Sequence, residues 1–409
     1  MDLVVTGIGE LATLQGSAAR AGRYMGEVTR RRGAYLVVED GRVAEVGQGT
    51  PPPGGPRLDV GGRAVTAGLV DPHTHAVFAA ERAAEFYARA QGAPYTGGGI
   101  LATVAAVRAA SEDQLVALAR PRLERMLRAG TTTVEVKSGY ALSTEGELKL
   151  LRAIRRLGEE LPLTVVPTFL GAHAVPPEVP RADYLRRLVE EMIPRVAAEG
   201  LARFCDVFCD QGFYTVEEAR QVLAAGQAAG LPAKLHADEL AAVGGAELAA
   251  ELGAVSADHL LRTTPAGAAA MAAAGVVGVL LPGTAFVLGA SYPPARAFLD
   301  AGLPLALATD FNPGSSPLSS LPLVMSLAAL RLGLTPAEIL CAVTLNAAAA
   351  VGMADQLGTL EVGKWADLAV WDVPTFAEVP YWIGQPLAWA VVKRGQVVWR
   401  DCGSWPTPS

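Results

Sequence analysis

Each of the five histidines in the chain follows a short apolar run. His73 and His75 lie in the sequence VDPHTH, and an aspartate, Asp310, follows a similar run in LALATDFNPG. The remaining histidines are His173 in FLGAH, His236 in KLHADE and His259 in SADHL. Imidazole nitrogens with one carboxylate are ligands for a catalytic metal ion of borderline softness, provided that one coordination position stays open. The pattern predicts a metal-dependent hydrolase.

Four of these residues form the expected ligand set. His73 and His75 are two positions apart, so on an extended segment both side chains point to the same side and can reach one ion. His236 and Asp310 follow other apolar runs and complete a mononuclear site with room for water. We expect one divalent or trivalent metal ion per subunit, either zinc or iron.

His259 is either a further ligand or an acid and base beside the metal, and we favour the second role. A binuclear centre needs a bridging anion after the fourth apolar run, usually a modified lysine or a glutamate. That run offers Asp206, Cys209 and Asp210 instead. Glu239 follows His236 closely enough to exchange a proton with the activated water. Its neighbour Asp238 competes for this role, and the residues alone leave the choice open.

A second group of polar residues lies where substrate-binding loops are expected. Arg82 suits a two-pronged bond to a substrate carboxylate, although a solvated surface arginine is an equal alternative on sequence alone. The candidates for a polar pocket are Arg82, Tyr140, His173, Asn312, Gly314 and Ser315.

Three further features receive structural interpretations. Lys137 in EVKSGY invites the role of a modified bridging ligand, but it lies on the second apolar run, and we expect a structural role behind the ligands. Cys205 and Cys209 are expected to be buried as small hydrophobic residues. Residues 97–100, GGGI, fit no phosphate-binding motif and are interpreted as a flexible loop over the pocket.

Strand and helix signals alternate through the centre of the chain, which is typical of an α/β fold with a parallel sheet. Thr-x-x-Glu pairs predict helix starts at Thr144, Thr215 and Thr335. The eight expected strands lie in residues 69–75, 131–140, 163–173, 203–212, 231–239, 253–261, 275–284 and 303–313. Eight such units favour a closed (β/α)8 TIM-like barrel, whose carboxyl-terminal strand ends carry the chemistry.

The two ends of the chain differ from its centre. Residues 1–65 and 353–409 hold short strand-like runs separated by glycine and proline, with a hairpin turn expected at residues 393–396. We expect these ends to pair as one small β-sandwich domain. Residues 66–352 then form the barrel.

The net charge of −7 and the pI near 5.4 argue against a nucleic-acid or anionic-membrane partner. The four cysteines show no CxxC spacing, which favours reduced thiols. No signal peptide and no apolar stretch long enough for a membrane span are recognisable. We therefore expect a cytoplasmic protein with a small-molecule substrate, and a homodimer as its assembly.

Longer motifs give a more specific indication. VDPHTHAVFAAERAAEF, EVKSGYALSTEGELKLLRAI, PTFLGAHAVPPE, KLHADE, VSADHL and ATDFNPGSSP resemble the imidazolonepropionase family of the amidohydrolase superfamily. The resemblance spans nearly the whole chain, although the run before GGGI is shorter than in the family.

The resemblance implies roles for particular residues. It implies metal ligation by His73, His75, His236 and Asp310, and proton transfer by Glu239, His259 or Asp310. It implies substrate contacts from the six pocket candidates and from Glu239. The implied reaction opens the imidazolone ring of 4-imidazolone-5-propanoate and gives N-formimidoyl-L-glutamate, a step of histidine degradation.

Two alternatives remain. One is a deaminase or other amidohydrolase acting on another small heterocycle; deamination would release ammonia, which ring opening does not. A non-catalytic barrel would purify without metal.

Overall fold

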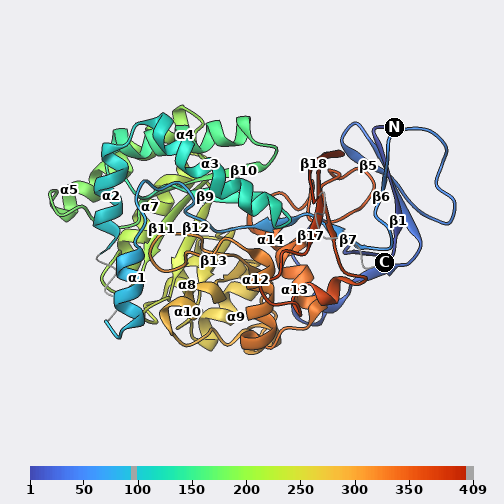
Figure 1. Cartoon of the computed structure of the whole chain (residues 1–409). Coiled ribbons are helices and arrows are strands. Elements are labelled where there is room, and N and C mark those ends of the chain that lie inside the picture. Colours follow the sequence, from blue (N-terminus) through green and yellow to red (C-terminus); the bar gives the residue numbers. More distant parts are fainter. Residues whose placement is uncertain (94–98, 402–409) are drawn as a thin grey trace.

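The computed structural model describes residues 1–93 and 99–401. Residues 97 and 98 of the loop that we expect over the pocket lie outside the described residues, whereas Gly99 and Ile100 begin helix α2 (Ile100–Ala109). Figure 1 shows a large α/β body beside a smaller β region that contains both ends of the described chain.

The centre of the body is a parallel eight-stranded sheet whose strands follow one another in chain order. It closes into a barrel because Asp310 donates a backbone hydrogen bond to His73 (3.0 Å) and His75 donates one to Phe311 (2.9 Å). The strands are β8 (Leu69–Asp71), β9 (Thr131–Lys137), β10 (Thr164–Ala172), β11 (Phe204–Cys209), β12 (Ala233–Ala237), β13 (Ser256–His259), β14 (Val277–Leu280) and β15 (Leu305–Leu307). All eight predicted strands are confirmed.

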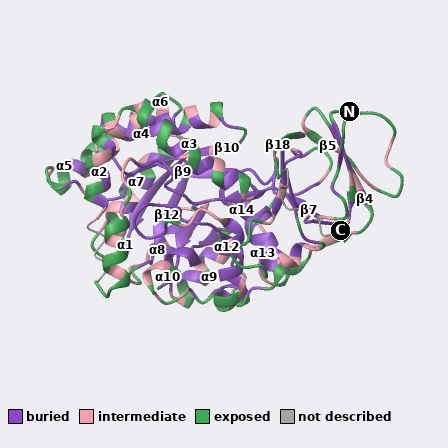
Figure 2. Ribbon diagram, viewed as in Figure 1, coloured by how far each residue is buried: buried purple, intermediate pink, exposed green. Residues whose placement is uncertain are grey.

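Helices surround the barrel and leave its strands buried, as the purple ribbons at the centre of Figure 2 show. The α-helices are α1 (Ala83–Ala90), α2 (Ile100–Ala109), α3 (Glu112–Arg128), α4 (Thr144–Glu160), α5 (Arg181–Arg187), α6 (Ile193–Ala198), α7 (Val216–Ala228), α8 (Gly245–Glu251), α9 (Pro265–Ala274), α10 (Pro282–Leu288), α11 (Ala295–Asp300), α12 (Leu321–Leu327), α13 (Pro336–Val343) and α14 (Leu345–Ala350). Short helical turns are η1 (Gly22–Gly26), η2 (Leu188–Met192), η3 (Ala328–Leu332) and η4 (Phe376–Glu378). Within the described residues, no helix combines the length and apolarity that a bilayer crossing requires.

Two of the three predicted helix starts are confirmed in detail. Thr215 and Thr335 are N-cap residues with reciprocal bonds to the glutamate three positions later. The third helix, α4, also begins at Thr144 as predicted, but its N-cap is Ser143 and the carboxylate of Glu147 bonds elsewhere. Glu147 accepts hydrogen bonds from the backbone N–H groups of Gly139, Ala141 and Leu142, so it shapes the loop after β9.

The chain ends build two further sheets, with strand orders β5-β4-β1-β6 and β18-β17-β16-β7-β2-β3. Residues from both ends share one apolar core, separate from that of the barrel. The strands are β1 (Leu3–Ile8), β2 (Glu10–Thr13), β3 (Thr29–Arg31), β4 (Ala34–Glu39), β5 (Arg42–Gln48), β6 (Arg57–Asp59), β7 (Ala64–Ala67), β16 (Leu368–Trp371), β17 (Ala388–Lys393) and β18 (Gln396–Arg400).

The turn expected at residues 393–396 joins β17 to β18. Its two central residues, Arg394 and Gly395, have φ angles of 45° and 75°, as a tight hairpin turn requires. The fold class, a TIM-like barrel with a β-sandwich from both ends, is confirmed. The exact boundaries 1–65, 66–352 and 353–409 stay a prediction, and β7 crosses the first of them.

Candidate metal centre

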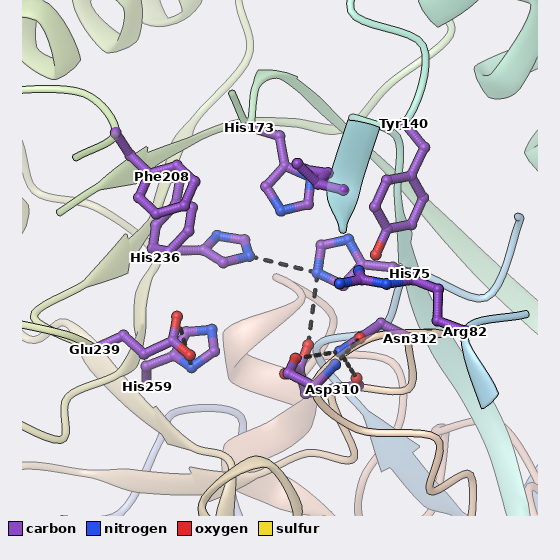
Figure 3. Close-up of a pocket in the computed structure, with 13 residues that line it drawn as sticks. His75, Arg82, Tyr140, His173, Phe208, His236, Glu239, His259, Asp310 and Asn312 are labelled. Atoms are coloured by element: carbon purple, nitrogen blue, oxygen red, sulfur yellow. Dashed lines mark hydrogen bonds and ion pairs between the residues drawn. The ribbon is translucent and has the colours of Figure 1, made fainter. Parts of the chain in front are cut away.

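Three histidines and one aspartate converge at the carboxyl-terminal mouth of the barrel. Nε2 of His75 lies 3.5 Å from Nε2 of His236 and 3.6 Å from Oδ1 of Asp310. Nε2 of His73 lies 3.5 Å from the same aspartate oxygen. Figure 3 shows His75, His236 and Asp310 directed toward one shared space. The strand ends of β8, β12 and β15 therefore bring the four predicted ligands together.

The donor set fits a metal ion. All four residues are at most 2% exposed, and Nε2 of His73 has no hydrogen-bond partner among the described residues. Burial lowers the pKa of His73 and His75 well below the ordinary value, which favours the neutral imidazole that a metal requires. Burial also raises the pKa of Asp310 to about 6, a penalty that a nearby cation would offset.

Carboxylates and a hydroxyl group behind the site orient the candidate ligands. Nδ1 of His73 lies 2.6 Å from Oδ2 of Asp258, and Nδ1 of His236 lies 3.1 Å from Oδ1 of Asp206. Thr284 donates a hydrogen bond of 2.6 Å to Oδ2 of Asp310. Each contact leaves the inward-facing nitrogen or oxygen available for a cation.

Sequence reasoning missed these three orienting residues as parts of the site. The available signal for Asp206 was strand alternation, because every second residue of a barrel strand points inward. For Asp258 the signal was its place beside His259 at the end of a strand. Neither signal identifies the histidine that each aspartate contacts.

His259 and Glu239 form a second pair at the edge of the ligand set. Nδ1 of His259 lies 3.6 Å from Oε2 of Glu239. Burial lowers the pKa of His259 well below its ordinary value, whereas burial and the charges of Asp310 and Asp210 raise the pKa of Glu239 well above its ordinary value. The shifts favour the neutral form of the imidazole and the protonated form of the nearby carboxyl group, a pairing suited to proton transfer. His259 could also reach an ion shared with His73 and Asp310.

Asp238 and Glu239, the two candidates for proton transfer after β12, have different surroundings in the structure. The carboxylate of Asp238 accepts hydrogen bonds of 3.1 Å from Val243 N, Gly245 N and Thr263 Oγ1, so it fixes the start of α8. Glu239 lines the pocket instead. A φ of 51° at Asp238 turns the chain sharply between the two residues.

Aromatic side chains form one wall of the pocket (Figure 3). His173 stacks on His75 with ring centroids 5.1 Å apart, and Tyr140 lies 5.6 Å from His75. Burial lowers the pKa of His173 to about 3. Phe208 and Phe213, which the sequence analysis did not select, stack 3.9 Å apart in the same wall. This wall can hold a flat heterocycle against the ligand set.

Arg82 lines the pocket with a side chain that is 9% exposed, so the alternative of a solvated surface arginine is wrong. Asn312 and Ser315 also line the pocket. Both polar atoms of the Asn312 amide, however, already form hydrogen bonds within the protein. Its oxygen accepts from the N–H groups of Gly314 and Ser315, and its nitrogen donates to Asp310 O. Gly314 lies behind Arg82, where a Cβ would stand 2.3 Å from Nη1.

Two cysteines lie near the barrel but outside this site. Cys205 and Cys209 are buried free thiols on β11, as predicted. Cys205 packs against Gly226 of α7, on the helix-facing side of the barrel. Burial raises the pKa of Cys209 to about 12, so its thiol stays protonated.

The model of the amidohydrolase family matches residues 79–399. Together with the barrel and its ligand set, this match defines the chain as an amidohydrolase. Curated imidazolonepropionases are 49% identical over 97% of both chains in Symbiobacterium thermophilum and 48% identical over 98% of both chains in Myxococcus xanthus. The chain belongs to the imidazolonepropionase family.

Solved structures of more distant proteins share the fold. A zinc- and atraton-bound variant of the atrazine chlorohydrolase from Arthrobacter aurescens has a TM-score of 0.75 at 18% identity, with 97% of this chain and 94% of that chain covered. A zinc-bound adenosine deaminase from Xanthomonas campestris has a TM-score of 0.72 at 20% identity, with 97% and 92% covered. At these identities the likeness concerns the fold alone.

Proposed function

We propose that the chain hydrolyses the imidazolone ring of 4-imidazolone-5-propanoate to N-formimidoyl-L-glutamate. Family membership supports this reaction. The structural observation that carries it is the convergence of His73, His75, His236 and Asp310 beside a pocket that holds both an acid-base pair and an arginine.

One metal ion per chain, zinc or iron, would be held by Nε2 of the three histidines and by Asp310. When bound, it would lower the pKa of a water molecule and polarise the ring carbonyl. Zinc is the ion bound in the related chlorohydrolase and deaminase structures, which makes it the first metal to test.

Glu239 and His259 are the proposed proton carriers. In the hydrolysis, water adds to the ring carbonyl carbon and the bond from this carbon to the ring nitrogen breaks. The water loses a proton and the departing nitrogen gains one. Glu239 and His259 lie on the same side of the ligand set and can accept and return that proton. Asp310 is the third candidate acceptor.

Substrate recognition is assigned to the opposite side of the pocket. Arg82 is the proposed partner of the propionate carboxylate, because a guanidinium group binds a carboxylate through two parallel hydrogen bonds. Tyr140, His173 and Ser315 would contact the ring and the chain of the substrate. Asn312 and Gly314 would act mainly by shaping the loop that presents Ser315.

The test is a stoichiometric assay of the purified protein with 4-imidazolone-5-propanoate. We expect the imidazolone absorbance to disappear, one equivalent of N-formimidoyl-L-glutamate to form and no ammonia to be released. Stoichiometric ammonia would instead indicate a deaminase. The expected homodimer and cytoplasmic location also remain proposals.

A further inference from the structure

A cluster of buried charges lies within the barrel, directly beneath the candidate ligands. Its members lie on β9, β11, β12 and β13, and their side chains are fully buried. We call it the ion cluster; it consists of Glu135, Lys137, Asp206, Lys234 and Asp258. The mechanism above assigns no role to its two lysines.

Lys137 contacts both aspartates that orient the candidate ligands. Its Nζ lies 2.6 Å from Oδ2 of Asp206 and 3.5 Å from Oδ2 of Asp258. The same two aspartates contact Nδ1 of His236 and Nδ1 of His73. The ammonium group of Lys137 therefore contacts two aspartates, each of which contacts a different candidate ligand. We call each of these aspartate–histidine pairs a relay.

The three carboxylates of the ion cluster explain why an ammonium group is needed between them. Asp206, Asp258 and Glu135 are like charges in the buried interior of the barrel, where each anion is costly unless a cation compensates it. The carboxylate of each aspartate would accept a hydrogen bond from the Nδ1–H group of its histidine and leave the lone pair of Nε2 for the metal. A carboxylate that turned away from Nδ1 would no longer impose this tautomer.

We propose that Lys137 is a positioning residue that orients His73 and His236 together, through Asp258 and Asp206. The inference deepens the proposed function, because it rests on the assignment of these histidines as metal ligands. Lys137 itself contacts neither substrate nor metal in this proposal. Its removal should release both histidines at once, whereas replacing either aspartate should release only one.

Lys234 provides a matched control in the same cluster. Its Nζ is equally buried and bonds to Glu135 Oε2 at 2.9 Å and to the carbonyl oxygens of Pro72 and Ala350 at 3.2 Å. It balances charge and supports the backbone, but its hydrogen bonds do not go to the aspartates. Lys234→Met therefore removes one buried ammonium without removing the shared partner of the two relays.

The experiment compares the zinc affinity of the wild type, Lys137→Met and Lys234→Met by competition with a chromophoric chelator. Outer partners of metal ligands typically change affinity by about 10–100-fold. We expect a loss of that size for Lys137→Met and one of less than about threefold for Lys234→Met. The melting temperatures of the metal-free variants, measured in parallel, should fall by similar amounts. Equal losses of zinc affinity in the two variants, or none in Lys137→Met, would overturn the proposal.

A second measurement does not require a stable methionine variant. In zinc-loaded wild-type protein with ¹⁵N-labelled histidine, we expect a proton on Nδ1 of both His73 and His236. Unprotonated Nδ1 atoms would overturn the proposal. If wild-type protein bound neither zinc nor iron, the proposed function would fail as well; normal zinc binding with unaffected variants would remove only the role of Lys137.

Discussion

The carboxylate of Glu85 binds the guanidinium group of Arg82 through two hydrogen bonds. Oε2 of Glu85 lies 2.7 Å from Nε of Arg82, and Oε1 lies 2.7 Å from Nη2. Oε1 also accepts a bond from Arg89, whose Nη2 donates to Gly314 O at 2.6 Å. This chain of contacts joins helix α1, which follows β8, to the loop after β15 and holds Arg82 at the pocket.

Replacing Arg82 should mainly weaken substrate binding. For Arg82→Ala we expect KM for 4-imidazolone-5-propanoate to rise by about 10–100-fold, the size of a lost charge-assisted hydrogen bond, with a smaller change in kcat. The control is an imidazolone without the propionate side chain, for which KM should change little. Steady-state kinetics on both substrates decide the assignment, and an unchanged KM for the propionate substrate would reject it.

Substitutions of Glu239 and of its neighbour Asp238 should affect different properties of the enzyme. Glu239→Gln should lower kcat by about 10²–10⁴-fold, because a positioned proton carrier contributes that much, while bound zinc and melting temperature stay near wild type. Asp238→Asn should instead lower the stability by about 1–3 kcal/mol, because its carboxylate accepts several buried hydrogen bonds at the start of α8. Activity assays and thermal melts of both variants test this division. A Glu239→Gln enzyme with normal kcat would exclude Glu239 as the proton carrier.

Glu147 should be important for stability although it does not cap its own helix. Its buried carboxylate accepts three backbone N–H groups around Tyr140, so Glu147→Gln should cost about 1–3 kcal/mol of folding free energy. Glu145 lies two positions earlier on α4 with a side chain that is 75% exposed, and Glu145→Gln is the matched control. Denaturant titrations should show a clear loss only for the first variant; equal stabilities would show that the loop forms without this carboxylate.

Glu218 should make stability depend on pH in acid. Hydrogen bonds from Arg181 lower its pKa from 4.5 to about 2, with a smaller contribution from Thr215. A carboxyl group whose pKa is lower in the folded state stabilises the protein fully above the unfolded value, and this contribution disappears as the pH falls toward 2. The site is partly open to solvent, so we expect only about 1 kcal/mol.

The measurement is urea unfolding of the wild type and Glu218→Gln at pH 7, 4 and 3. The difference between the two proteins should be largest at pH 7 and should shrink as the pH falls below 4.5. Glu217→Gln, at a position where the side chain is 85% exposed, is the control. A difference independent of pH would contradict the role of the ion pair with Arg181.

The barrel could be predicted from the sequence because each buried parallel strand is a compact apolar run that ends in a polar residue. His73, His75, His236 and Asp310 mark such ends. The rule that barrel chemistry lies at the carboxyl-terminal face then brings them together without any knowledge of distances.

Contacts between distant segments could not be predicted in the same way. The bond between His73 and Asp258 joins residues 185 positions apart, and only the closed barrel brings them into contact. The Thr144 pattern matches those of Thr215 and Thr335, yet Glu147 binds the preceding loop because buried N–H groups there require an acceptor. The choice between Asp238 and Glu239 depended on one backbone turn after β12.

The central claim is that a single metal ion held by three histidines and one aspartate supports ring hydrolysis. The most direct measurement is a zinc titration of metal-free protein in which bound zinc and loss of imidazolone absorbance are followed together. Activity should be absent at first and should rise in proportion to bound zinc until one ion per chain is reached. Full activity of the metal-free protein, or saturation only at two ions per chain, would contradict the account.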